Sequence, residues 1–310
     1  MRIIFTGDNH LEFVSKETIN KFFQSAGDAS PDITISLGDT TNGWLQTKYV
    51  GIDRFFGSPL VLYVMGNHDL WSPHRRSGRS LDKSLLGAVE RLSSFPARPL
   101  EKSIDDEDTV CIFPEYNCVV VGTMGLPDFS HPKFVMPKEY YEKRSCTNDS
   151  EFIDLNGGWL RHTTVILSSF RKRIEKAVVT GCRDIVVATH YPIFEGQYNL
   201  SGEDISAYFF CHEAGEMIRA FAKEYPDKRF WCVAAHAHDY CRGEMSIEAD
   251  NIVSYGLQAD YGRLTFAVID TELGFETEPE VQWAMEAPRW ATSYRGPIIF
   301  SRESEGSDQS

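Results

Sequence analysis

Five short polar segments of the chain combine histidine with aspartate or asparagine. They are Asp8-Asn9-His10, Gly38-Asp39, Gly66-Asn67-His68-Asp69, His190 and His236-Ala237-His238. Aspartate offers hard anionic oxygens, and histidine offers borderline nitrogen donors. That mixture suits Mn, Fe or Zn better than Ca or Mg, whose sites are built from oxygen alone. The residue types therefore predict a transition-metal site.

The spacing within the segments indicates how two ions could be held. Asp8 and His10 alternate along extended chain, so both side chains can point to one side and bind one ion, and His236 and His238 share this spacing. Two adjacent ions also need one shared anionic ligand. Asp39 stands alone at its strand end and is the natural bridge.

Each polar segment directly follows a run of β-forming apolar residues, and these runs cover 2–7, 32–37, 60–65, 184–189 and 230–235. In a layered α/β fold, polar residues at the carboxyl ends of buried strands converge on one rim, where ligands bind. We therefore expect side chains from all five segments to meet at a single point.

The remaining sequence predicts the elements that hold this rim in place. Helices are expected from a cap at Ser15 to Gly27 and over 81–94, 160–180 and 212–224, and further strands over 109–113, 118–122, 252–255 and 264–270. Residues 126–158 have weak periodicity but several aromatic residues, which predicts a cap or insert rather than disorder. We expect one domain over 1–300 with this insert, and a disordered tail over 301–310.

Composition limits the classes of partner. The chain has 310 residues and a formal net charge of −14, which argues against broad binding to a nucleic-acid backbone but leaves a small anionic substrate open. Its seven cysteines include no CxxC pair, which favours a reducing compartment. With a first strand expected from residue 2 and no apolar run of membrane length, we expect a cytoplasmic protein with no membrane partner.

The order of the five segments resembles the calcineurin-like metallophosphoesterases over about residues 1–270. The resemblance implies an α/β fold in which a β-sandwich of two mixed sheets is flanked by helices, with the metal site at the carboxyl-terminal rim of the strands. It also implies two divalent or trivalent transition-metal ions, Mn, Fe or Zn, and a small phosphate mono- or diester as substrate. The reaction would be in-line attack of a metal-bound hydroxide.

The resemblance further implies a role for each site residue. Asp8, His10, Asp39 and His238 would bind the first ion, and Asp39, Asn67, His190 and His236 the second. His68 would donate a hydrogen bond to the phosphoryl group and protonate the leaving group, while Asp69 would orient His68 and raise its pKa.

One position departs from the family pattern. Ala235 stands where the family usually has glycine, a change that costs little at negative φ and strains the backbone at positive φ.

The sequence leaves alternatives open for the activity and for the residues that contact a substrate. A nuclease, protein phosphatase or pyrophosphatase could use the same site, and a non-catalytic metal-binding scaffold is less favoured because every ligand is present. Arg75 and Arg76, near His74 and Arg79, could bind the substrate anion or form a solvated basic loop. Tyr191 and Trp44 could stack on a substrate ring or simply pack.

Overall fold

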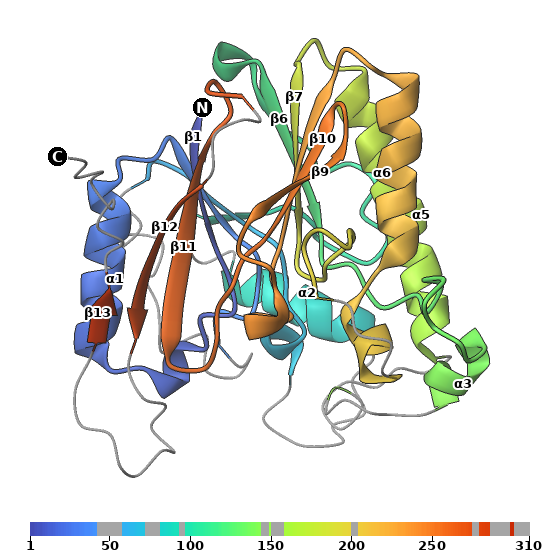
Figure 1. The fold of residues 1–310 in the computed structure, drawn as a ribbon, viewed down its shortest axis with the longest axis horizontal. Helices are drawn as coiled ribbons and strands as arrows, with labels where there is room; N and C mark the ends of the chain where they lie inside the picture. The colour runs from blue at the N-terminus through green and yellow to red at the C-terminus, as the bar shows by residue number, and fades with distance from the viewer. Residues whose placement is uncertain are drawn as a thin grey trace, which may run out of the picture.

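Two β-sheets face each other in the centre of the molecule, and helices cover both outer faces (Figure 1). The computed structural model describes residues 1–41, 58–71, 81–92, 97–143, 149, 158–199, 204–274, 279–285 and 298–300. The first sheet has seven strands in the order β13-β12-β11-β1-β2-β3-β4, and the second has six in the order β5-β6-β7-β8-β10-β9. This architecture confirms the expected sandwich of two mixed sheets.

The first sheet contains β1 (Arg2–Thr6), β2 (Ile33–Ser36), β3 (Val61–Tyr63), β4 (Ala97–Pro99), β11 (Arg263–Asp270), β12 (Glu280–Met285) and β13 (Ile298–Phe300). The second contains β5 (Cys111–Phe113), β6 (Cys118–Thr123), β7 (Asp184–Thr189), β8 (Arg229–Ala234), β9 (Met245–Ala249) and β10 (Ile252–Gly256). The described α-helices are α1 (Lys16–Asp28), α2 (Leu81–Leu92), α3 (Lys138–Lys143), α5 (Gly158–Val178) and α6 (His212–Glu224).

The alternation of side chains along the central strands builds the layers. On β1, Ile3 and Phe5 point into the core between the sheets, whereas Ile4 packs in the cluster beneath α1. On β7, Val186 and Ala188 join the inter-sheet core, and Ile185 belongs to the cluster under α5 and α6. Because both faces of these strands are buried, their sequences are continuous apolar runs.

Most predicted elements agree with the structure to within two residues. Ser15 caps α1 by accepting a hydrogen bond from the backbone N of Thr18 at 3.2 Å, and α6 has the predicted bounds. The long helix begins at Gly158 and ends at Val178, two residues earlier at each end than predicted. The strand predicted over 109–113 begins only at Cys111.

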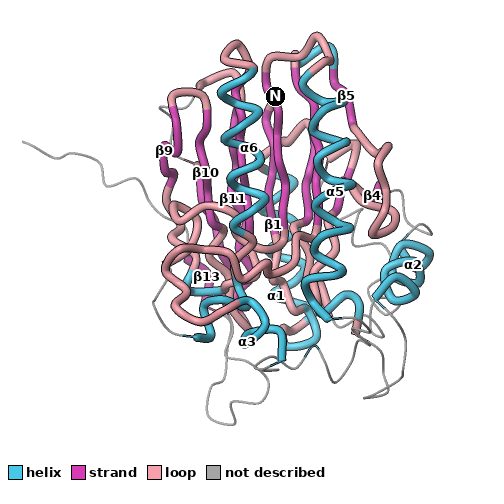
Figure 2. Tube along the Cα trace, turned by 90° about the vertical axis from the view of Figure 1, so that its right-hand side faces the viewer, coloured by secondary structure: helices cyan, strands magenta, loops and turns pink. Residues whose placement is uncertain are grey.

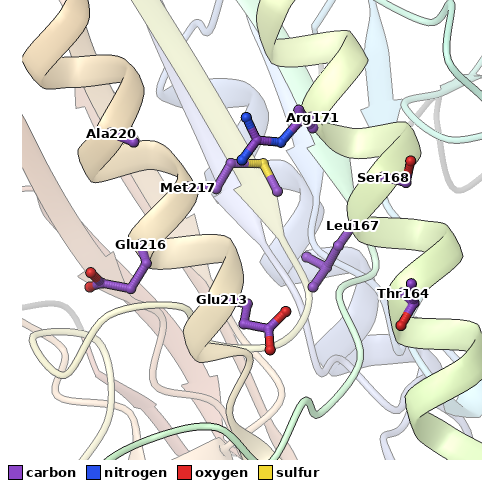
Figure 3. A pocket seen from close by; sticks show the side chains of 8 residues that line it. All are labelled: Thr164, Leu167, Ser168, Arg171, Glu213, Glu216, Met217 and Ala220. Atoms are coloured by element: carbon purple, nitrogen blue, oxygen red, sulfur yellow. The ribbon is translucent and has the colours of Figure 1, made fainter.

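The helices α5 and α6 lie side by side on the outer face of the second sheet (Figure 2). A groove of about 500 Å³ runs between them and is lined by Thr164, Leu167, Ser168, Arg171, Glu213, Glu216, Met217 and Ala220 (Figure 3). None of the five polar segments contributes to its lining. No helix in the described ranges has the length and apolar character needed to cross a membrane.

The described part of the predicted insert packs against the body of the protein. Phe129 and Tyr141 are buried in one cluster with Trp159 and Tyr208. The Tyr208 hydroxyl donates to the backbone O of Tyr141 at 2.6 Å, which ties α3 to the segment that precedes α6. Phe129 and Tyr141 therefore anchor the described part of the insert.

Candidate metal centre

The five polar segments meet at one edge of the sandwich, where parallel strands of both sheets end. In the first sheet β1, β2 and β3 run parallel, and in the second β7 and β8 do. Backbone hydrogen bonds join the segments that follow them: Asp8 N donates to Gly38 O at 3.0 Å, and Ala235 N donates to His190 O at 3.0 Å. The common direction of the strands thus brings distant parts of the chain together.

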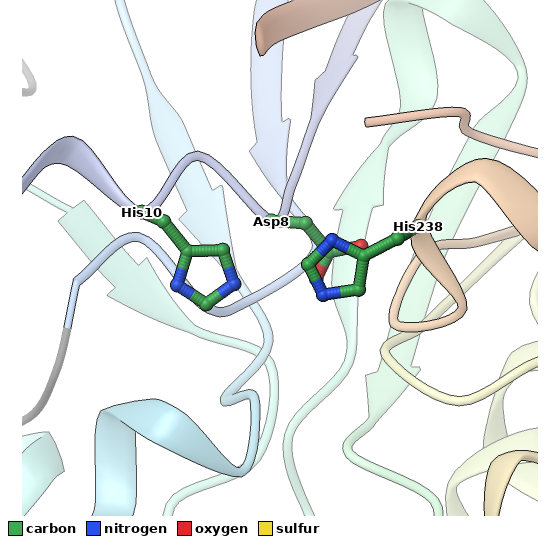
Figure 4. Close-up of side chains that lie close together, drawn as sticks. All are labelled: Asp8, His10 and His238. Carbon is green, nitrogen blue, oxygen red and sulfur yellow. The ribbon is translucent and has the colours of Figure 1, made fainter. Parts of the chain in front are cut away.

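Asp8, His10 and His238 form the first group of candidate ligands (Figure 4). Their ligand atoms all lie within 4.8 Å of one another. Both carboxylate oxygens of Asp8 and both ring nitrogens of His10 are buried without a hydrogen-bond partner among the described residues. Because burying an unpaired carboxylate is costly, this donor set fits a cation that pairs with it.

Asp39, His190 and His236 form a second group with the same 4.8 Å limit. His190 Nε2 lies 3.0 Å from His236 Nδ1, 3.0 Å from Asn67 Oδ1 and 3.5 Å from Asp39 Oδ2. Four candidate ligand atoms therefore point at one small volume, and they are the four residues predicted for the second ion.

Asp39 lies between the two groups, as a bridging ligand must. Its Oδ2 is 3.5 Å from His190 Nε2 on one side and 4.0 Å from His10 Nε2 on the other. Its Oδ1 accepts a hydrogen bond from the backbone N of His68 at 2.8 Å, which fixes the carboxylate. One carboxylate thus reaches both sets of histidines.

Five of the candidate ligands have left-handed backbone conformations. Their φ angles are 49° for Asp8, 39° for His10, 52° for Asp39, 68° for His236 and 50° for His238. Only three other non-glycine residues in the described ranges have positive φ: Ser30, Asn117 and Phe129. This conformation costs an L-residue about 1–2 kcal/mol. Such strain is typical of functional sites, where surrounding contacts enforce a special geometry.

Two glycines allow the loops to approach each other. A Cβ on Gly66 would lie 2.0 Å from Asp39 Oδ1, and a Cβ on Gly38, whose φ is 97°, would lie 2.4 Å from Gly66 N. Both positions exclude any side chain. The loops after β2 and β3 can therefore touch only because both carry glycine there.

Comparison with known proteins identifies the family. The sequence profile of the calcineurin-like phosphoesterases matches residues 1–240. The chain belongs to this family. It is therefore a metal-dependent hydrolase of phosphoric ester bonds. No curated protein sequence matches the chain.

Two solved structures with this phosphoesterase fold resemble the chain. Phosphopantetheinyl hydrolase from Mycobacterium tuberculosis is 15% identical with a TM-score of 0.59, and the match covers 83% of this chain and 89% of that one. A dimetal phosphatase from Danio rerio is 12% identical with a TM-score of 0.51, covering 87% and 93%. At these identities the likeness concerns the fold alone.

The departure from the phosphoesterase pattern at Ala235 is accommodated without strain. Ala235 is absent from the residues with positive φ. Its side chain instead approaches Gly7, where an added Cβ would lie 3.0 Å from Ala235 Cβ. The glycine that permits close contact between the two sheets is therefore Gly7, at the end of β1.

Burial shifts the pKa values of this phosphoesterase site in different directions. Burial raises the pKa of Asp8 to about 6 and lowers those of His10 and His236 well below their usual value. Burial also opposes the charge on Asp39 and His190, but their mutual attraction holds the pKa of Asp39 well below its ordinary value and raises that of His190 to about 9. His10 and His236 are thus neutral, the form that binds metals.

The net pKa of His68 is lowered rather than raised, and the orienting role of Asp69 toward His68 stays a prediction. Burial lowers the pKa of His68, and the carboxylates that oppose this effect most are those of Asp39 and Asp149. Asp69 Oδ2 instead accepts hydrogen bonds from the backbone N atoms of Asp39 and Gly66, each at 2.9 Å. Asp69 therefore ties together the two loops that carry the bridge and His68. The physical reason is that a buried carboxylate beside unpaired backbone N–H groups satisfies them first.

The His68 ring lies beside the ligand groups and is held between two rings. It stacks on Trp71 with centroids 3.7 Å apart and an interplanar angle of 25°. On another side it meets the edge of His10 at 4.7 Å. It therefore faces the same volume as the candidate ligands, where a reacting phosphoryl group would be.

Of the residues predicted to contact a substrate, the structure describes only Tyr191. Arg75 and Arg76, together with His74, Arg79 and Trp44, lie outside the described residues. Tyr191 is only 1% exposed, and its ring lies against that of His236 with centroids 3.8 Å apart. Tyr191 therefore packs against a candidate ligand, and its contact with a substrate stays a prediction.

Three site residues escaped the sequence prediction. Asp260 Oδ1 lies 3.5 Å from His238 Nδ1, and the Tyr261 ring lies 4.4 Å from that of His10. Both follow β10, which runs parallel to β8, so the argument from strand ends could have found them. Asp149 accepts a hydrogen bond from Asn67 Nδ2 at 2.8 Å. It comes from the insert, where no sequence pattern pointed to the site.

Proposed function

We propose that this phosphoesterase hydrolyses a small phosphate mono- or diester with two transition-metal ions, Mn, Fe or Zn, in its site. The observation that carries the proposal is the position of Asp39, whose Oδ2 lies within 4.0 Å of histidines from both ligand groups. Asp8, His10 and His238 complete the first set, and Asn67, His190 and His236 the second.

The candidate ligands would bind the two ions, and His68 would transfer a proton. When bound, the two ions supply a nucleophile at neutral pH and neutralise charge on the phosphoryl oxygens. Neutral His68 retains one N–H that can donate to a phosphoryl oxygen. The negative charge of a bound substrate raises the pKa of His68 and so allows it to protonate the leaving oxygen.

The charge and the burial of the site favour a small substrate. The net charge of −14 disfavours a nucleic-acid backbone, whereas a pair of cations attracts a single phosphate group. Asp8, Asp39 and His190 are each at most 1% exposed, so a reacting phosphoryl group has to enter the edge of the sandwich. We propose no membrane partner.

The same proposal covers the organisation and location of the chain. β1 near the start and β13 at 298–300 belong to one sheet, which supports a single domain over 1–300 that carries the insert at 126–158. The described cysteines are free thiols, which supports a reducing compartment such as the cytoplasm; they are Cys111, Cys118, Cys182, Cys211, Cys232 and Cys241.

Metal analysis combined with a substrate screen tests the proposal. The purified chain should contain about two ions, and it should hydrolyse an aryl phosphate monoester or diester with Mn, Fe or Zn. Asp39→Asn should lose most metal and activity. Asp270→Asn, which changes a residue beside Arg2 at the other end of the strands, should keep both. Near-normal turnover in Asp39→Asn refutes the bridge, and two bound ions without hydrolysis of any ester favours a scaffold.

A further inference from the structure

Asp149 is a buried carboxylate that contacts the metal centre from the insert. It is 2% exposed, and its Oδ1 accepts hydrogen bonds from Asn67 Nδ2 and from Trp71 Nε1, both at 2.8 Å. We infer that Asp149 is a positioning residue that orients the Asn67 amide so that its oxygen points at the second metal site. The inference rests on the metal site of the proposed function.

The chemistry of the two side chains determines the orientation of the amide. An asparagine amide has an oxygen that can bind a cation and an NH₂ group that cannot. An ionised carboxylate only accepts hydrogen bonds, so Asp149 requires the NH₂ group of Asn67 to face it. Asn67 Oδ1 is thereby directed to the other side, where it lies 3.0 Å from His190 Nε2. Without Asp149, the amide could rotate and present its NH₂ group to the ion.

Trp71 holds the carboxylate in place. The indole N–H is a donor only, so its hydrogen bond to Asp149 Oδ1 locks that oxygen between Trp71 and Asn67. The same indole ring stacks on His68 at 3.7 Å. A chain of contacts thus runs from His68 through Trp71 and Asp149 to the candidate ligand Asn67. A single residue of the insert therefore contacts both Asn67 and the tryptophan that stacks on His68.

Asp184 offers a control for the removal of a buried carboxylate that accepts a hydrogen bond from a tryptophan. It is 1% exposed, and its Oδ1 accepts a hydrogen bond from Trp231 Nε1 at 3.0 Å. It begins β7, whereas His190 follows the other end of that strand. Asp184 also pairs with Arg229 Nε at 2.6 Å and with Arg183 Nη2 at 3.0 Å. A substitution at Asp184 therefore removes several contacts of a buried carboxylate far from the metal centre.

Mn²⁺ binding to the full chain tests the role of Asp149 without measuring activity. Loss of a hydrogen-bond partner of a metal ligand typically weakens metal affinity about 10–100-fold. Asp149→Ala should lower the affinity for the second ion by this factor and leave the affinity for the first ion unchanged. In electron paramagnetic resonance, the spectrum of two coupled Mn²⁺ ions should give way to that of a single ion at the same Mn²⁺ concentration.

Conservative variants separate orientation from general loss of structure. Asp149→Asn retains an acceptor oxygen and should restore most of the affinity. Trp71→Phe keeps a ring but not the donor and should weaken binding of the second ion about tenfold, at the lower end of the range for such partners. Asp184→Asn should leave both ions bound. If Asp149→Ala does not fold, wild-type affinity in Trp71→Phe still overturns the inference.

The outcomes distinguish this inference from the proposed function. Wild-type Mn²⁺ binding in folded Asp149→Ala, or equal losses in Asp149→Ala and Asp149→Asn, overturns the orienting role alone. A wild-type chain that binds two ions but cleaves no ester overturns the proposed function alone. A wild-type chain that binds no Mn²⁺ overturns both.

Discussion

Burial and a neighbouring charge raise the pKa values of two candidate ligands for different reasons. The pKa of Asp8 is raised to about 6 by burial, and that of His190 to about 9 because Asp39 outweighs the effect of burial. Both groups must lose a proton before they can bind a cation. In the metal-free protein, metal binding therefore competes with protons at individual residues.

We expect Mn²⁺ affinity to rise with pH between about pH 5 and pH 8. Below about pH 6 the Asp8 carboxyl becomes neutral, and displacing its proton costs about tenfold in affinity per pH unit. His190, with a pKa of about 9, must lose a proton throughout this range. Calorimetric titration at about pH 5, 6, 7 and 8 measures the effect. Asp8→Asn should make the part below pH 6 less steep, because only His190 then still has to lose a proton there. An affinity that falls with rising pH contradicts the prediction.

His68 is the residue whose loss should separate chemistry from metal binding. Its ring stacks on Trp71 and belongs to neither predicted set of ligands. His68→Ala should keep the metal content but slow hydrolysis about 10²–10⁴-fold for esters with poor leaving groups, and less for good ones. His131→Ala, which changes a buried histidine outside the five segments, should not show this dependence on the leaving group. Equal losses for both kinds of ester speak against proton donation by His68.

At the scale of elements, the site depends on how closely the loops after β2 and β3 approach. Gly66 lies against Asp39, and Asp69 accepts hydrogen bonds from the backbone of both. The loops are thus held by the same contacts that place the bridging carboxylate. Any group inserted between them has to move Asp39.

Gly66→Ala should therefore damage the metal centre and the fold together. The new Cβ would lie 2.0 Å from Asp39 Oδ1, and overpacking of this kind costs about 1–3 kcal/mol of stability. Mn²⁺ stoichiometry and thermal unfolding measure the two effects. The control is Gly181→Ala, where no atom lies within 4 Å of the added Cβ and stability should change by less than about 0.5 kcal/mol. Full Mn²⁺ binding by Gly66→Ala contradicts the close approach.

At the scale of the whole molecule, the metal centre links the two sheets. Asp8, His10 and Asp39 follow strands of the first sheet, and His190 and His236 follow strands of the second. A ligand that binds only the folded state stabilises it, and one held across both sheets resists their separation.

Removal of metal should therefore destabilise the entire domain. Saturating one site at 100 times its Kd adds about 2.7 kcal/mol to the free energy of unfolding. Thermal unfolding with Mn²⁺ and with a chelator should show a higher melting temperature for the loaded protein, by several degrees. Asp39→Asn should show little difference between the two conditions. Equal melting temperatures for loaded and stripped wild-type protein count against a centre held by both sheets.

The residues of the candidate centre and their places at the strand ends could be predicted from the amino-acid sequence. Continuous apolar runs and polar strand ends are local signals, so β1, β7 and β8 and the segments after them could be predicted from short stretches of chain. The bounds of α6 could also be predicted from a short stretch of chain, because its apolar residues repeat with helical period.

The contacts among these residues became visible only in the folded chain. The left-handed backbone of Asp8 and Asp39 and the lowered pKa of His68 depend on burial and on loops that meet from distant parts of the chain. The same is true of Asp69, which binds loop backbone, and of Asp149, which reaches Asn67 from 82 positions away. No local pattern encodes a contact over such a separation, because its energy exists only once the two segments are packed together.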